Sequence, residues 1–168
     1  MKYLILIILL MFVFACEKNS TGPEESEEFD FHIQLLTSQT EISLGDDVQI
    51  DVRIEECTEP IFAVSLQLEF DNTILNFTES QNESEFFGDN CIIFVHETDG
   101  IVYTSASLIQ DDEKVSGSGS LFSLTFTSVA TGTSELNILL NEIKVYDEEG
   151  NYIEIDNIQT ENIQINVN

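Results

Sequence analysis

The sequence predicts an all-β fold, an antiparallel β-sandwich of about nine short strands. Apolar residues alternate with polar ones in short runs, and turn-forming residues separate these runs. The chain has 168 residues, of which 42% are apolar, enough for one hydrophobic core in a single domain. After residue 29 no window carries the apolar stripe of an amphipathic helix.

Strict alternation marks five of the expected strands. Val48, Ile50, Val52 and Ile54 alternate with polar residues, which is typical of a strand with one buried face and one wet face. The alternating segments are 29–35, 48–54, 64–70, 122–126 and 163–167.

A tight hairpin is predicted at Asp99-Gly100, a pair that favours two-residue turns. It would join a strand over 91–97 to a strand over 101–108. The turn residues 147–151 predict a second hairpin near the C-terminus.

The first 28 residues predict export and anchoring. Residues 1–15 combine one lysine with an eleven-residue apolar run, the length of a signal-peptide core and too short to span a bilayer. Cys16 follows Ala15 directly, which resembles a bacterial lipoprotein signal in which the cysteine is lipidated. The alternative is an ordinary secretory signal with a chance cysteine. Residues 16–28 are expected to be a flexible acidic tether, and residues 29–168 the folded domain.

The lipid on Cys16 would be the only attachment to the membrane. Once residues 1–15 are removed, four basic residues remain against 32 acidic ones, so no basic patch assists the anchor. Glu17 follows the cysteine, whereas Asp at this position is the inner-membrane retention signal of such lipoproteins. The resemblance therefore implies an outer-membrane lipoprotein of the bacterial cell envelope, facing either the periplasm or the surface.

The net charge of −27 excludes nucleic acid and anionic lipid surfaces as partners, because binding to them relies on Lys and Arg. A strongly negative domain attracts basic protein partners. Solubility alone, or adaptation to a salty habitat, explains the same composition.

Two cysteines, Cys57 and Cys91, remain beside Cys16. Because an exported protein meets an oxidising compartment, we expect a Cys57–Cys91 disulfide, worth roughly 3–4 kcal/mol. The alternative is a pair of buried free thiols.

Five short motifs occur in a fixed order along the body of the chain. They are Leu44-Gly45-Asp46, Phe70-Asp71 with Leu75, Gly117-Ser118-Gly119 before the strand at 121–126, Ala130-Thr131-Gly132-Thr133, and the turn at 147–151. In this order they resemble the cohesin domain, the receptor module of cellulosomes, with Asn72 where the family has proline. The resemblance covers about residues 31–168. It implies a nine-stranded antiparallel β-sandwich with jelly-roll topology that is non-catalytic and binds a helical dockerin module.

The resemblance also implies where a dockerin would bind. The family uses one sheet face, and the matching positions here are Ala63, Ser65, Gln67, His96, Tyr103, Ser105 and Ser107. In the family an Asn-x-Asp pair contacts the dockerin, and Ala63 and Ser65 take its place here, so the usual polar anchors are missing. The protein is expected to be a monomer without a cofactor, since calcium would belong to the dockerin.

Enzyme chemistry finds no support in the sequence. His32 and His96 lie on different expected strands, and the chain has no nucleophile, metal or phosphate-loop motif. Calcium ligands are offered by Asp111-Asp112-Glu113 and Asp147-Glu148-Glu149, but neither has EF-hand spacing, and solvated turns explain both.

Carbohydrate binding, with a polysaccharide as partner, is the alternative function. Sugar platforms use planar aromatic faces, yet the chain has no Trp, and the tyrosines after the leader are Tyr103, Tyr146 and Tyr152. Phe86 and Phe87 lie in a long polar loop, where they either form an exposed contact or pack over the end of the sandwich.

Overall fold

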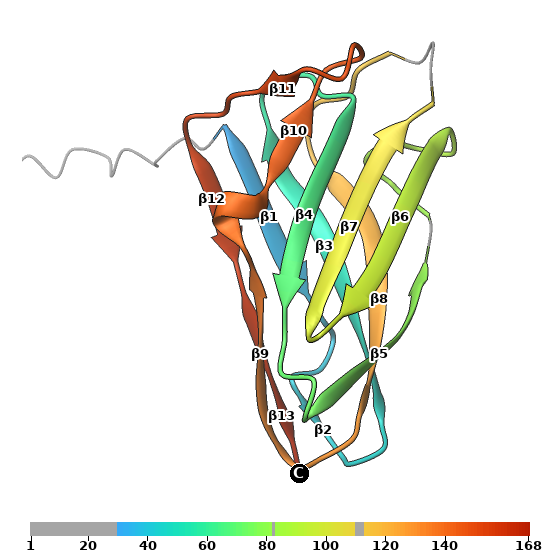
Figure 1. The fold of residues 1–168 in the computed structure, drawn as a ribbon, viewed down its shortest axis with the longest axis vertical. Helices are drawn as coiled ribbons and strands as arrows, with labels where there is room; N and C mark the ends of the chain where they lie inside the picture. Colours follow the sequence, from blue (N-terminus) through green and yellow to red (C-terminus); the bar gives the residue numbers. More distant parts are fainter. Residues whose placement is uncertain (1–29, 82, 110–112) are drawn as a thin grey trace, which may run out of the picture.

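The computed structural model describes residues 30–81, 83–109 and 113–168. These residues form thirteen β-strands and one short 3-10 helix, arranged as two sheets packed face to face (Figure 1). The predicted all-β sandwich is confirmed. Across the described part of the chain, no helix has both the length and the apolar character needed to span a bilayer.

The smaller sheet has five strands. In spatial order they are β12 (Ile158–Glu161), β1 (Phe31–Leu36), β3 (Asp47–Cys57), β8 (Gly119–Ser128) and β5 (Leu75–Gln81). The long antiparallel pair of β3 and β8 forms its centre.

The larger sheet has eight strands arranged around β4 (Ala63–Glu69). On one side of β4 lie β7 (Ile101–Leu108) and then β6 (Cys91–Thr98), which is the edge of the sheet. The strands on the other side are β10 (Lys144–Tyr146), β11 (Tyr152–Ile153), β9 (Gly132–Ile138), β13 (Ile163–Val167) and β2 (Glu41–Ile42). The 3-10 helix η1 (Leu140–Glu142) connects β9 to β10.

The strand count and the pairing differ from the expectation of nine antiparallel strands. Each terminal segment is divided between the two sheets, so that β1 and β2 form one divided strand and β12 and β13 another. The two divided strands run in the same direction along one side of the sandwich. The pairs β1–β12 and β13–β2 are therefore parallel.

The core confirms the predicted alternation. Val48, Ile50 and Val52 are buried, as are the described apolar residues of the segments 31–35, 64–70 and 122–126, whereas Ile163 in the last segment is partly buried. Phe126 is fully buried, with the ring of Phe70 edge-on at 4.9 Å between centroids. Burial of each large apolar side chain contributes about 1.5–3 kcal/mol, so this face-to-face packing supplies most of the stability.

The loop before β6 packs inward. Phe86 and Phe87 are both buried and meet edge-to-face at 4.9 Å. The Phe86 backbone N–H donates to the carbonyl of Ser120, and the Phe87 N–H donates to Oγ of Ser84. Packing of the two rings is confirmed, and an exposed aromatic contact at this loop is wrong.

The predicted Cys57–Cys91 disulfide does not form in this structure, where both cysteines are free. Cys57 ends the central strand β3 and is buried, and its thiol donates to the carbonyl of Glu59 at 3.1 Å. Cys91 begins the edge strand of the other sheet and lines a surface hollow with Arg53. The two thiols thus belong to different sheets and different surroundings.

The hairpin at Asp99-Gly100 is confirmed. Asp99 has φ 53° and Gly100 has φ 81°, the left-handed pair that a two-residue turn requires. A Cβ at Gly100 would lie 2.9 Å from the carbonyl oxygen of Phe70, so glycine is needed for space as well. This turn fixes the register of β6 on β7.

Candidate functional site

The outward side of the larger sheet brings the predicted contact residues together. β6, β7, β4 and β10 lie next to one another and face the viewer in Figure 1. Their outward residues form three rows across the strands. From β6 through β7 to β4, the rows are Ile92–Ser107–Ala63, Phe94–Ser105–Ser65 and His96–Tyr103–Gln67. We call these nine residues the docking face, and all seven predicted positions belong to it.

Small side chains line the middle of the docking face. Ala63, Ser65, Ser105 and Ser107 make a low floor two strands wide. On β6 the side chains of Ile92 and Phe94 stand above it, each 63% exposed. The face is therefore a trough with one apolar wall.

The opposite wall comes from β10. Tyr146 lies opposite Ala63, and Lys144 lies opposite Ser65. Strands are about 4.8 Å apart, so the two walls, on β6 and β10, are separated by three intervals, about 14 Å. An α-helix with its side chains is about 10–12 Å across, so the spacing of β6 and β10 is on the scale of one helix.

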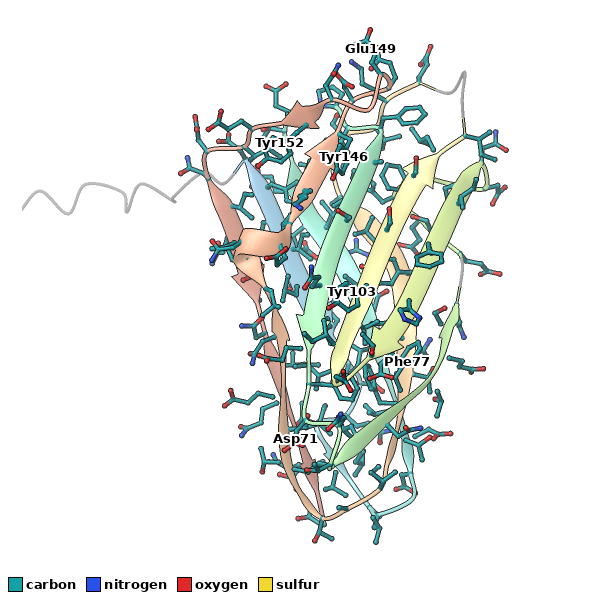
Figure 2. All side chains as sticks on the ribbon, in the orientation of Figure 1. Asp71, Phe77, Tyr103, Tyr146, Glu149 and Tyr152 are labelled. Atoms are coloured by element: carbon teal, nitrogen blue, oxygen red, sulfur yellow. The ribbon has the colours of Figure 1, made fainter. Side chains whose placement is uncertain are left out.

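The third row closes one end of the trough. The amide of Gln67 donates to Oε2 of Glu142 at 3.2 Å, which fixes both side chains. Tyr103 lies beside them on the front of the sheet (Figure 2). This end is polar, whereas the end near Ile92 is apolar.

The profile of the cohesin domain family matches residues 34–167, which is most of the chain. The protein belongs to the cohesin domain family. Cohesin domains are non-catalytic modules for protein–protein interaction. A search of curated proteins finds no match for the sequence.

Solved cohesin structures share this fold. The non-cellulosomal cohesin of the archaeon Archaeoglobus fulgidus is 21% identical with a TM-score of 0.64, and the match covers 83% of this chain and 91% of that one. A cohesin module from a family 33 glycoside hydrolase of Clostridium perfringens is 13% identical with a TM-score of 0.67, covering 84% and 98%. A type II cohesin domain from the cellulosome of Acetivibrio cellulolyticus is 15% identical with a TM-score of 0.64, covering 81% and 95%.

Two residues of the docking face were not predicted from the sequence of this cohesin domain. Ile92 and Phe94 lie on the same side of β6 as His96, which was predicted. The segment 91–95 is apolar at every position, whereas a strand with one wet face should be polar at every second one. This departure from alternation is the sequence signal that indicates an exposed apolar row on β6.

The tyrosines of the cohesin domain do not form a flat sugar platform. Tyr146 and Tyr152 lie at the upper end of the larger sheet in Figure 2, with their rings 76° apart and 6.5 Å between centroids. Tyr103 lies lower on the same sheet. Because two of the three rings meet edge-on, they do not offer one plane for a sugar ring.

In the acidic turn at 147–149, carboxylates are already engaged by hydrogen bonds and an ion pair within the chain. Asp147 accepts hydrogen bonds from the backbone N–H groups of Glu149 and Asn151 and from the Asn151 amide, which lower the pKa of its carboxyl. Glu148 pairs with Lys114 at 2.9 Å. Within the described residues no three His, Cys, Asp or Glu side chains are placed to hold a metal ion. Asp111 and Asp112 lie outside the described residues.

The two histidines are in different sheets. His32 on β1 lies 3.2 Å from Glu161 on β12, while His96 is on the docking face. They cannot act together on one substrate, in keeping with a non-catalytic cohesin module.

Proposed function

We propose that this cohesin domain binds the helical dockerin-type module of a partner protein in the trough of its docking face. Related folds support the proposal: one similar structure is the third cohesin ScaC in complex with the ScaB dockerin from Acetivibrio cellulolyticus, 12% identical with a TM-score of 0.66. The observation that carries the proposal for this chain is the apolar wall of Ile92 and Phe94 beside a floor of small residues.

The trough suits an amphipathic helix laid along the strands. Large exposed apolar side chains are the usual anchors of protein interfaces, and small neighbours let a partner approach the backbone closely. The polar pair of the family is replaced by Ala63 and Ser65, so the affinity must come from apolar contact more than from hydrogen bonds. We therefore expect the partner helix to present aliphatic or aromatic residues toward Phe94.

The test uses the full chain purified in detergent. Calorimetry and pull-down with dockerin-bearing proteins should detect binding that a calcium chelator abolishes, because dockerins fold around calcium. Phe94→Ser should weaken this binding by at least about tenfold, the usual effect of removing a central aromatic anchor. Val129→Ser, which alters another exposed apolar residue outside the docking face, is the matched control and should have no effect.

Carbohydrate binding is the competing outcome of the same experiment. Retardation of the chain in a polysaccharide gel, lost in Tyr152→Ala and insensitive to chelator, would replace the dockerin proposal. Absence of both activities would leave the domain a structural envelope component and would refute dockerin binding.

We also propose that the domain is displayed at the bacterial envelope through a lipid on Cys16, with a link to polysaccharide breakdown. The lipoprotein signal at residues 1–16 supports the anchor, although Cys16 lies outside the described residues. The link to polysaccharides is supported by the related module that is carried by a family 33 glycoside hydrolase. A labelled fatty acid should be incorporated into the wild-type chain and not into Cys16→Ser.

A further inference from the structure

The edge strand β6 has backbone groups available for pairing. The Ile109 N–H donates to the carbonyl of Asn90 at 3.0 Å, and in an antiparallel pair the bonded positions recur at every second residue. β6 therefore bonds to β7 through its outward residues, from Ile92 to Thr98. The backbone N–H and C=O groups of the intervening residues, Ile93 and Val95 among them, point away from β7 along the edge.

β6 lacks most of the features that usually protect an exposed edge. Natural edges are kept from pairing by short strands, prolines, lysines or bulges. β6 has eight residues, contains neither proline nor lysine, and pairs with β7 without a register shift. Its one carboxylate, Glu97, lies next to the hairpin and accepts a hydrogen bond from the Gly100 N–H at 3.0 Å. By contrast β5, an edge of the smaller sheet, has a register shift between Phe77 and Glu79. No other strand of the described residues pairs with β6 besides β7.

The negative charge around the β6 edge favours a positively charged partner. The segment 75–98 has five carboxylates and no Lys or Arg. Cys91, where β6 begins, lines a hollow together with Glu83, Glu85 and Asp89. Arg53 also lines this hollow and pairs with Glu85 at 3.3 Å, so the carboxylates there still outnumber the single cation. A second copy of the chain would bring the same negative charges against one another, whereas a basic segment would be attracted.

We propose that the free edge of β6 binds an extended segment of a partner polypeptide, with lysine or arginine alternating with apolar residues, as an additional strand of the larger sheet. The backbone of Ile93 and Val95 supplies the hydrogen bonds, and the exposed side chains of Ile92 and Phe94 receive the apolar residues of the segment. The basic residues meet the carboxylates beside the edge. This binding mode uses main-chain groups and does not depend on dockerin binding.

The probe is a synthetic ten-residue peptide of alternating lysine and valine, acetylated and amidated at its ends. A peptide with proline in place of valine carries the same charge but cannot pair as a strand. We expect the full chain in detergent to bind the valine peptide at least about tenfold more tightly, the equivalent of one or two backbone hydrogen bonds. Equal binding of the two peptides would mean attraction by charge alone and would overturn the proposal.

Matched variants locate the contact. Val95→Pro removes an N–H that points away from β7, whereas Val95→Ala also replaces the valine side chain but keeps that N–H. Binding of the valine peptide should fall about tenfold in Val95→Pro relative to Val95→Ala. Ile93→Pro and Ile93→Ala form a second pair should the first proline variant unfold, as judged by circular dichroism.

Amide hydrogen exchange of the wild-type chain is an independent measurement. The peptide should slow exchange at Ile93 and Val95, while Ile92 and Phe94 are already protected by β7. Unchanged exchange at Ile93 and Val95 in the saturated complex would refute strand addition. Self-association of the free chain through β6, lost in Val95→Pro, would assign the edge to a second copy and would also overturn the proposal.

Discussion

Gly119 at the start of β8 lies directly against the backbone of Phe86. A Cβ at position 119 would be 2.9 Å from both the nitrogen and the Cα of Phe86, closer than side chains pack. The Phe86 N–H donates to the carbonyl of Ser120, so the loop is bonded to β8 at this point. The contact holds the buried pair Phe86 and Phe87 over the end of the sandwich.

Gly119→Ala should therefore destabilise the domain. Because the added methyl group meets backbone atoms, the loop must shift, and overpacking of this kind costs about 1–3 kcal/mol. The free energy of unfolding in urea measures the effect. Ser118→Ala, at the exposed neighbouring residue, is the control, and equal stability of the two variants would contradict the prediction.

Ser128→Ala should also lower stability, because Ser128 fastens the turn before β3 to the end of β8. Its buried hydroxyl accepts from the Gly45 N–H at 2.8 Å and donates to the carbonyl of Ser43 at 2.9 Å. Removing the hydroxyl breaks both of these hydrogen bonds, which costs about 1–3 kcal/mol. Urea unfolding measures it against Ser116→Ala, an exposed serine, and a loss no greater than that of the control would be evidence against this role.

Alkaline pH should destabilise the domain in a way that depends on Cys57. Burial, together with the charge of Glu59, raises the pKa of its thiol from 9.0 to about 12. The folded chain holds this proton longer than the unfolded chain, so the stabilisation is complete below pH 9 and is lost as the pH rises toward 12. The unfolding free energy, measured between pH 8 and 11, should fall more steeply in the wild type than in Cys57→Ala. Parallel pH profiles would contradict the raised pKa.

Cys16→Ser should release the protein from membranes. Without the cysteine no lipid can be attached, and the remaining acidic chain has no basic patch to hold it at a bilayer. Partition into the detergent phase of Triton X-114 measures the anchor. Glu17→Gln, which keeps the cysteine, serves as control, and detergent partition of Cys16→Ser would refute anchoring through this residue.

Alternation predicted the strands that pack against the core, because burial of one face imposes a period of two. The strands at 48–54 and 122–126 are confirmed within β3 and β8. β6 shows the limit of this reasoning: with Ile92 and Ile93 both apolar, the pattern does not tell which face is buried. Only the pairing with β7 shows that Ile92 and Phe94 face outward. For that reason the sequence did not predict these two exposed residues of the docking face.

Long-range pairing was the other feature beyond the sequence pattern. β2 has two residues, too few to show a period, and its parallel pairing with β13 joins segments from opposite ends of the chain. The number of cysteines likewise does not tell which of them lie close together. The expected disulfide between Cys57 and Cys91 is absent. The hairpin at Asp99-Gly100 was predictable because its turn residues are adjacent.

The position of β1 bears on how the domain would withstand force. β1 lies between β12 and β3 and pairs with β3 over residues 31–36 and with β12 over residues 31–34. A pull on the chain before residue 30, directed along β1, loads both ladders in shear, and their hydrogen bonds must break together rather than unzip one by one. If the proposed lipid on Cys16 holds the chain, a partner that pulls on the larger sheet would load β1, the strand at which these two ladders resist separation.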